Sequence, residues 1–124
     1  RKRTYHTIIP GFLMKDGKAV GPFGVMGGFM QPQGHLQVIM NMIDFKMHPQ
    51  AALDAPRFRW DEALKVSVEN TFDTYKAQKL RELGHMIHID LYSGGFGRGQ
   101  IILKEKDGYI AGTETRCDGT ISYY

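Results

Sequence analysis

An apolar segment that runs into two adjacent glycines and then into a helical pattern constrains this chain most. Val25 and Met26 precede Gly27 and Gly28, and Pro32 lies where the first turn of a helix is expected. Glycine has no Cβ, so the backbone at such a turn can approach a ligand closely. The N–H groups at a helix start favour an anion, or an oxyanion that forms during a reaction. Gly27 and Gly28 are therefore a candidate oxyanion cradle, although the pattern alone favours a plain strand-to-helix turn that binds nothing.

The composition is that of one folded domain of ordinary size. Of 124 residues, 42% are hydrophobic and 23% are charged, values close to globular averages. The formal net charge of +3 is mild and the basic residues form no stripe, so nucleic acid is not an expected partner. No apolar run approaches the roughly 18 residues of a membrane-spanning helix, so no membrane partner is expected either. Cys117 is the only cysteine, which makes an internal disulfide impossible.

Hydrophobic periodicity and turn residues predict an α+β fold in which helices cover a mostly antiparallel sheet. The expected elements, given as residue ranges, are strands 7–14, 19–26, 58–60, 64–68, 87–91, 101–104 and 109–112 and helices 32–45, 49–55 and 73–83. Asp16-Gly17 and Asp107-Gly108 are expected at hairpin turns. One face of the first long helix is apolar and is expected to be buried against the sheet; its residues are Leu36, Ile39, Met40 and Ile43.

Other residues that could carry chemistry each have a simpler structural explanation. His85 and His88 lie on opposite faces of an expected strand, and no carboxylate has ligand spacing with them, so no metal site is expected. His48 precedes a proline at a helix start, where a capping role is expected. Cys117 is expected to be a structural thiol, because no basic partner is evident. The glycine-rich segment 94–99 lacks the ending of a phosphate-binding loop, and we expect a mobile surface loop.

Several motifs in a fixed order resemble the C-terminal part of the γ-glutamyltranspeptidase family. No single motif is specific, but their combination is, and it runs through essentially the whole chain. The chain ends in Glu114-Thr115-Arg116-Cys117-Asp118-Gly119 and a tyrosine terminus, which resembles a weakened form of the family's closing signature. The motifs before it are Lys2-Arg3 followed by a polar pair and Pro10, the strand with Gly27-Gly28 and a helix, Asn41-Met42-Ile43-Asp44-Phe45, and Ala55-Pro56-Arg57-Phe58.

The resemblance implies an N-terminal-nucleophile hydrolase fold, an α/β/β/α sandwich. Residues 1–124 would be a single C-terminal portion of its small subunit. In this family a precursor cuts itself, and the new N-terminal threonine attacks γ-glutamyl amides such as glutathione. The acyl group then passes to water or to an amino acid, and the threonine hydroxyl is activated by its own α-amine. The resemblance implies no metal and no organic cofactor.

Four residues match positions that the family uses at its active site. Gly27 and Gly28 match adjacent glycines whose N–H groups stabilise the oxyanion, which is the catalytic role expected here. His6 and Thr7 fall where better-known members have a serine pair that binds the substrate's α-carboxylate, so they are the expected substrate-binding residues. Thr7 keeps a hydroxyl, whereas His6 differs in size and titration. Met26 replaces the usual proline, and these departures resemble a divergent branch with members that act on other small amides such as oxamate.

The resemblance also assigns part of the active site to sequence upstream of Arg1. The nucleophilic threonine and the acidic residues that hold the substrate's α-amino group would lie there. Residues 1–124 alone are therefore expected to be inactive. Their expected partners are the substrate amide and the remainder of the precursor, which is the large subunit and the start of the small one. An apolar face left uncovered is expected to make the isolated chain self-associate.

Three functions remain open at this point. The first is γ-glutamyl amide or glutathione hydrolysis, or acyl transfer, with this chain supplying the oxyanion-hole glycines and part of the substrate pocket. The second is an amidohydrolase or acylase of the same fold that acts on another small amide. The third is a non-enzymatic binding module. Better-known family members are secreted or periplasmic, and a cytoplasmic location is the alternative for a divergent branch; the sequence does not decide between them.

Overall fold

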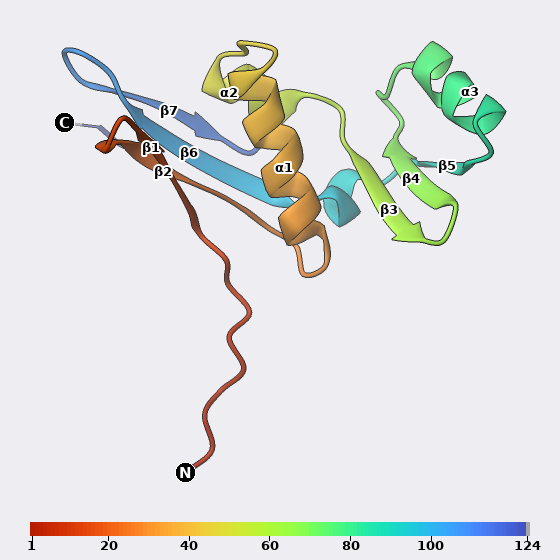
Figure 1. The fold of residues 1–124 in the computed structure, drawn as a ribbon, viewed down its shortest axis with the longest axis horizontal. Coiled ribbons are helices and arrows are strands. Elements are labelled where there is room, and N and C mark those ends of the chain that lie inside the picture. The colour runs from red at the N-terminus through yellow and green to blue at the C-terminus, as the bar shows by residue number, and fades with distance from the viewer. Residues whose placement is uncertain (124) are drawn as a thin grey trace.

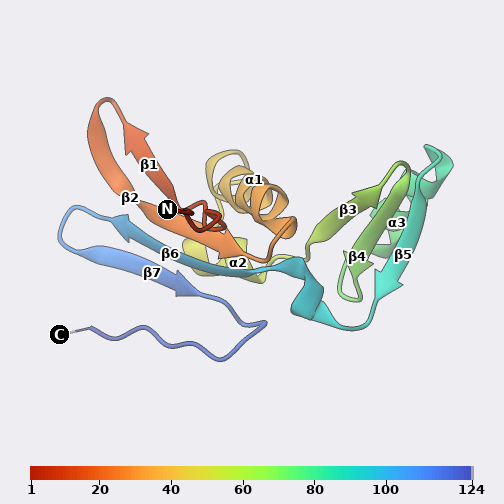
Figure 2. The same cartoon turned by 90° about the horizontal axis from the view of Figure 1, so that it is seen from below.

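The computed structural model describes residues 1–123, which form two β-sheets joined side by side (Figures 1 and 2). Residues 1–10 are an extended segment that leads into the first sheet. The strands are β1 (Gly11–Lys15), β2 (Lys18–Met26), β3 (Phe58–Glu62), β4 (Lys65–Glu69), β5 (Met86–Asp90), β6 (Arg98–Lys104) and β7 (Tyr109–Thr113). The helices are α1 (Met30–Ile43), α2 (Pro49–Asp54) and α3 (Thr74–Glu82), with a 3₁₀ turn, η1, at Ser93–Phe96.

The larger sheet has four antiparallel strands in the order β1-β2-β6-β7. The predicted turn at Asp16-Gly17 is confirmed, since both residues have the positive φ that a tight hairpin requires. The predicted β6–β7 hairpin is also confirmed, because Lys104 pairs with Tyr109 across the expected turn. Helices α1 and α2 cover one face of this sheet (Figure 2). The core lies between them and consists of Phe23, Val25, Val38, Leu53 and Ile101.

Helix α1 packs on the sheet through a different face from the one predicted. Its fully buried residues follow one another at four-residue spacing: Met30, Gly34 and Val38. A Cβ at Gly34 would lie 2.6 Å from Val25 Cγ1, so the glycine lets the helix backbone approach β2. Ile39 packs against the core, but three members of the predicted buried face, Leu36, Met40 and Ile43, are 57%, 40% and 49% exposed. The prediction that this face is buried against the sheet is therefore wrong for those three residues.

The smaller sheet has the order β3-β4-β5, with an antiparallel and then a parallel pair. Helix α3 packs against it, and Val66, Val68 and Ala77 are buried there. The predicted cap of α3 is confirmed, since the Asp73 carboxylate accepts a hydrogen bond of 2.7 Å from the Lys76 N–H. Most strand pairs in the chain are antiparallel, and the predicted α+β class is confirmed.

Two glutamines on α1 connect it to the outer edge of β3. The side-chain amide of Gln37 accepts from the N–H of Phe58 at 3.1 Å and donates to its carbonyl oxygen at 2.8 Å. Gln33, one turn earlier, bonds Trp60 in the same way. Because residues four apart on a helix share a face and residues two apart on a strand share an edge, the two amides match successive backbone groups. These side chains therefore attach the smaller sheet to the helix that covers the larger one.

Candidate functional site

The glycine pair forms the turn between β2 and α1, as predicted. Gly27 and Gly28 have φ values of +150° and +59°, a backbone conformation that residues with a Cβ rarely adopt. The Gly27 carbonyl accepts from the Met30 N–H at 3.0 Å, and the Gly28 carbonyl accepts from the Gln31 N–H at 3.1 Å. Both carbonyls are therefore engaged within the turn, and no acidic residue lies in the first turn of α1. The polar groups that such a turn can offer a ligand are its N–H groups, which favour negative charge.

Two hollows meet at this turn, and both include Gly28 and Phe29 in their walls. The larger one, of about 640 Å³, lies toward the smaller sheet and is lined by Gly27, Gln33, Arg59, Trp60 and Asp61 among others. The smaller one, of about 310 Å³, lies toward the N-terminal segment and is lined by Tyr5, His6, Thr7, Gln31 and Pro32 among others. The turn thus separates two spaces of different chemistry.

The structure brings His6 and Thr7 to the glycine turn, although they are more than twenty residues away in the sequence. Both line the smaller hollow together with Gly28. Gln31, in the first turn of α1, donates a hydrogen bond of 2.8 Å to the Thr7 carbonyl and holds the segment there. The predicted strand at 7–14 begins only at Gly11, so His6 and Thr7 precede the strand and lie in the extended segment. Three predicted site residues therefore share one hollow, and Gly27 lines the other.

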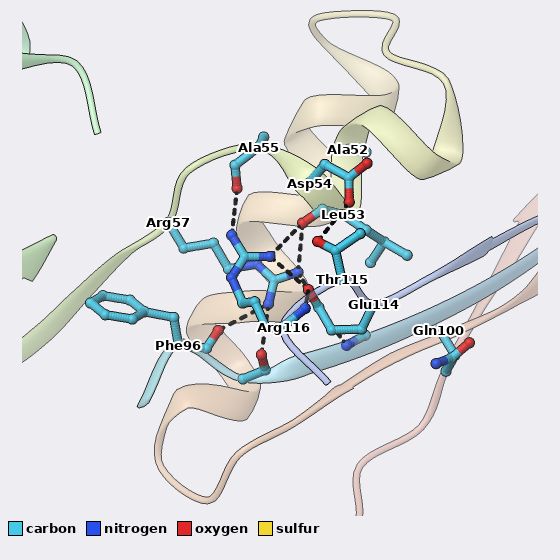
Figure 3. A network of polar contacts seen from close by, with 12 residues as sticks. Ala52, Leu53, Asp54, Ala55, Arg57, Phe96, Gln100, Glu114, Thr115 and Arg116 are labelled. Carbon is cyan, nitrogen blue, oxygen red and sulfur yellow. Dashed lines mark hydrogen bonds and ion pairs between the residues drawn. The ribbon is translucent and has the colours of Figure 1, made fainter. Parts of the chain in front are cut away.

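A buried network of four charges lies behind the turn, and Figure 3 shows three of its members, Arg57, Glu114 and Arg116. Arg57 Nη2 donates to Glu114 at 2.8 Å, and Arg116 donates to Glu114 at 2.7 Å and to Glu69 at 2.5 Å. Glu69 also accepts from the Arg57 N–H at 2.7 Å. The side chains of all four are 7% exposed or less. Buried charges require partners, and here two arginines and two glutamates compensate one another.

The surroundings shift the pKa values of Glu114, Arg57 and Arg116. Burial alone would raise the pKa of Glu114, but attraction to Arg57 and hydrogen bonds from Arg116 and the Gly99 N–H outweigh it, so the pKa lies below its ordinary value. Burial and the neighbouring Arg116 lower the pKa of Arg57. For Arg116 burial is outweighed by its bonds to Glu69 and Glu114, and the pKa is raised. The shifts at Glu114 and Arg116 therefore favour the charged forms of both groups, so this ion pair persists at neutral pH.

The network supports the glycine turn through the segment before β6. Arg57 Nη1 donates to the carbonyl oxygens of Phe96 at 2.9 Å and Gly97 at 3.1 Å. Gly97 in turn lies against the turn, since a Cβ at Gly27 would be 3.0 Å from the Gly97 Cα. A Cβ at Gly97 would be 3.0 Å from the Met26 carbonyl oxygen. The backbones of Gly27 and Gly97 are therefore in contact, and the hydrogen bond from Arg57 holds Gly97 in place.

The prediction of a mobile surface loop at 94–99 is wrong. Phe96 is fully buried, residues 93–96 form the turn η1, and β6 begins at Arg98. The sequence motifs around Arg57 and Arg116 carried the family resemblance, but sequence reasoning did not identify their ion pairs. A buried arginine needs acceptors, and the carbonyls of this glycine-rich segment supply two of them. Glycines that appeared to give mobility are instead places where two backbones approach closely.

The remaining candidates have structural roles or none. His48 is the N-cap of α2, where its Nδ1 accepts from the Gln50 N–H at 3.2 Å, which confirms the predicted capping role. Cys117 is a free, half-buried cysteine. Within residues 1–123 there is no group of three or more histidine, cysteine or acidic side chains that could hold a metal ion. Over the same residues, the helices are too short or too polar to cross a bilayer.

The sequence matches the family model described as Gamma-glutamyltranspeptidase over residues 1–124. The chain belongs to the γ-glutamyltranspeptidase family. The order of motifs that suggested this family is thereby confirmed, and the turn, the two hollows and the ion network are features of a member of it.

Individual relatives carry several related activities in their names. The chain is 58% identical to a cephalosporin acylase from Bacillus halodurans, with a TM-score of 0.92 over 98% of this chain and 23% of that one. It is 35% identical to the glutathione hydrolase-like YwrD proenzyme of Bacillus subtilis over 96% of this chain and 24% of that protein. It is 31% identical to the acylase ACY 1 proenzyme of Pseudomonas sp. strain SE83 over 96% of this chain and 21% of that protein.

These similarities confirm the predicted fold, that of the N-terminal-nucleophile hydrolases in this family. The chain spans less than a quarter of the length of these three relatives. Two of the three are named proenzymes, which is consistent with an expected partner in the remainder of a precursor.

Proposed function

We propose that this chain supplies the oxyanion hole and part of the substrate pocket of a γ-glutamyltranspeptidase-like enzyme. The observation that carries the proposal is the turn at Gly27 and Gly28, placed at the junction of two hollows with its carbonyls engaged internally. N–H groups held in this way stabilise the negative charge that develops on a carbonyl oxygen during acyl transfer, and do so without reorganising. His6 and Thr7, in the smaller hollow, contact the acyl part of the substrate.

The reaction needs a nucleophile from the rest of the precursor. In the proposed mechanism an N-terminal threonine attacks the amide carbonyl, and its hydroxyl proton passes to its own α-amine. A C–O bond forms, and the carbonyl oxygen becomes an oxyanion between the N–H groups of the glycine turn. The C–N bond then breaks, and the departing amine takes the proton. Water or a second amine releases the acyl group by the reverse sequence and returns a proton to the threonine oxygen.

Expression of the full precursor tests this proposal. We expect self-cleavage directly before a threonine upstream of residue 1, and release of p-nitroaniline from γ-glutamyl-p-nitroanilide by the processed protein. The chain of residues 1–124 alone should release none. Replacement of that threonine by alanine should abolish both cleavage and activity. A precursor that stays uncleaved and inactive toward every small amide would rule out the enzyme assignment.

A second candidate is an acylase of the same fold with a different amide substrate. It is favoured by His6, which stands where better-known members have a serine that binds the α-carboxylate, and by relatives named acylases. His6→Ser and Thr7→Ser in the full precursor separate the two candidates. If γ-glutamyl amides are the natural substrates, neither change should raise their turnover relative to that of other small amides. If another amide is natural, His6→Ser should raise γ-glutamyl turnover and lower the turnover of that amide.

A further inference from the structure

We propose that strand β5 is an interface between two copies of this protein, in which the two β5 strands pair antiparallel about a two-fold axis at His88. This interface does not depend on the proposed function. Strand β5 is the outer strand of the smaller sheet and lies at the end of the molecule away from the larger sheet (Figure 2). An outer strand has a row of backbone N–H and C=O groups without a neighbouring strand, and such a row is a template for pairing with another chain.

The free backbone groups of β5 belong to Ile87 and Ile89. The Met86 N–H donates to the Leu64 carbonyl oxygen at 2.8 Å, so the backbone groups of Met86 point toward β4. Successive residues of a strand direct their backbone groups to opposite sides, so those of Ile87 and Ile89 point away from β4. Over residues 1–123, nothing outside β4 forms a hydrogen bond with these two backbones. Both residues therefore offer a donor and an acceptor to a further strand.

The other outer strands of the two sheets are covered or irregular. The outer edge of β3 is bonded by the side chains of Gln33 and Gln37. The outer edge of β7 is bonded by Gln50 of α2, whose amide accepts from the Thr113 N–H at 3.0 Å and donates to its carbonyl oxygen at 2.8 Å. Strand β1 has a break in its register. In contrast, β5 has an unbroken register and contains neither proline nor lysine, so it lacks the usual features that prevent strand pairing.

A second copy of β5 satisfies all the free groups at once. In an antiparallel pair, opposite residues that exchange two hydrogen bonds alternate with opposite residues that exchange none. If Ile87 lies opposite Ile89 of the second copy, the symmetry also places Ile89 opposite the second Ile87, and both pairs exchange hydrogen bonds. His88 then lies opposite itself on the axis, in a pair that exchanges none. The edge is therefore self-complementary, as a two-fold interface requires.

The side chains of β5 are compatible with this register. Ile89 is 43% exposed, and the register pairs it with Ile87 in a β-branched pair of the kind that stabilises neighbouring strands. On the other face of the sheet, His88 lies diagonally to Asp90 of the second copy, so an imidazole and a carboxylate come within reach of each other. Leu91, which is 83% exposed and follows β5, lies opposite His85 of the second copy and loses exposed apolar surface. These contacts favour a second copy as the partner of this edge.

The oligomeric state of the processed full-length protein tests the proposal. We expect light scattering to give twice the mass of one protomer. Ile89→Pro should halve this mass, because proline lacks the N–H that the pairing uses, while the N–H that it replaces forms no bond with β4. Ile89→Thr keeps the N–H and a β-branched side chain, so it is the matched control and should stay dimeric. The urea midpoint of each variant shows whether the fold is retained.

A cross-link locates the interface without the proline variant. In the proposed register the Cα atoms of the two His88 residues are about 4.5 Å apart, a separation that a disulfide can span. His88→Cys in a Cys117→Ser background should therefore form a dimer in air that a reductant reverses. Met86→Cys in the same background is the control, because its two copies would lie about 13 Å apart and should not cross-link.

Three results would overturn the proposal. The first is a wild-type protein that stays monomeric at high concentration. The second is a dimer that survives Ile89→Pro and gives no cross-link in His88→Cys. The third is a monomer in which the Ile87 and Ile89 amides resist hydrogen exchange, since another segment of the precursor would then cover the edge.

Discussion

The side-chain amide of Gln33 forms two hydrogen bonds with the backbone of Trp60. Its Nε2 donates to the Trp60 carbonyl oxygen at 3.1 Å, and its Oε1 accepts from the Trp60 N–H at 2.7 Å. A helix side chain thus occupies the position that a neighbouring strand would have at the edge of the smaller sheet. Since Gln33 lies in the first turn of α1 and Trp60 lines the larger hollow, this pair sets the separation between the glycine turn and the far wall of the cavity.

Gln33→Leu should weaken activity more than its cost in stability suggests. The change removes two partly exposed hydrogen bonds and is expected to lower the free energy of unfolding by about 1 kcal/mol. It also releases Trp60 and widens the hollow beside the turn, which should lower kcat/KM of the processed enzyme. Gln37→Leu is the matched control, since it removes the equivalent pair with Phe58 farther from the hollow. Equal losses of activity in the two variants would show that Gln33 does not position the cavity wall.

Gly27→Ala should lower kcat by roughly a hundredfold while the protein still folds. The new Cβ would meet the Gly97 Cα at 3.0 Å, and the backbone φ of +150° disfavours a side chain, so the turn must shift. Such a shift displaces the N–H groups from the oxyanion. Gly24→Ala in β2 is the control, because its Cβ would meet nothing within 4 Å. The measurements are kcat with a fixed amide and the urea midpoint of each variant; full activity in Gly27→Ala would contradict the proposed oxyanion role.

Glu114→Gln should destabilise the protein by about 3–5 kcal/mol, because it leaves Arg57 and Arg116 short of a buried counter-charge. Glu62→Gln breaks an exposed pair with Lys65 and should cost less than about 1 kcal/mol. Urea unfolding of the two variants, monitored by circular dichroism, gives the comparison. Similar losses in both would mean that the buried network is not a source of stability.

The same glutamate makes stability depend on pH. Its folded-state pKa lies below the ordinary value of 4.5, so its contribution is fully present above pH 4.5 and is lost as the pH falls through the folded-state pKa. Asp61 acts in the same direction: burial raises its pKa, but hydrogen bonds from Ser67 and Arg59 outweigh burial and lower it. Unfolding midpoints measured from about pH 7 downward should therefore fall below about pH 4.5. The fall should be shallower in Glu114→Gln, and an equally steep fall would assign it to other groups.

The isolated chain of residues 1–124 should self-associate through the exposed apolar face of α1. Leu36, Met40 and Ile43 lie on this face, and Phe29, 97% exposed, lies at its start. An uncovered patch of this kind promotes association. Light scattering should show a mass above that of a monomer, and the double change Leu36→Gln and Met40→Gln should reduce it. A monomer of unaltered mass at high concentration would contradict the prediction, and an oligomer that the double change leaves intact would place the interface elsewhere.

The sequence predicted the elements of this fold better than their packing. The tight turn at Asp16-Gly17, the β6–β7 hairpin and the Asp73 cap depend on neighbouring residues, and all three were confirmed. The buried face of α1 depends on how the helix packs against β2. Gly34 lets the helix approach that strand, since a Cβ there would lie 2.6 Å from Val25 Cγ1. A glycine has no hydrophobic side chain, so it carries no weight in a periodicity argument.

In the candidate site, too, local features were predicted from the sequence and contacts between distant residues were not. The glycine turn is local, and its form was predicted from the residues around it. The hydrogen bonds from Arg57 to the segment behind the turn were not predicted, because the carbonyl groups that accept them lie 39 and 40 residues farther along the chain. The pairing of Gln33 with Trp60 was missed for a related reason: a glutamine on a helix surface gives no sign that a strand edge will meet it. The family resemblance brought His6 and Thr7 to attention, and no periodicity would have done so.

The buried ion network also limits how early during synthesis the fold can form. Arg57 and Glu114 are 57 residues apart, and Glu69 and Arg116 are 47 apart. During synthesis Arg57 and Glu69 leave the ribosome well before their partners exist. In a nascent chain that ends before residue 114, Arg57 has no Glu114 as its counter-charge. The Arg57 side chain should therefore not yet be buried behind the glycine turn. The glycine turn would then be among the last parts of the molecule to become rigid, which would delay any self-cleavage that depends on it until residues 114 to 116 have been synthesised.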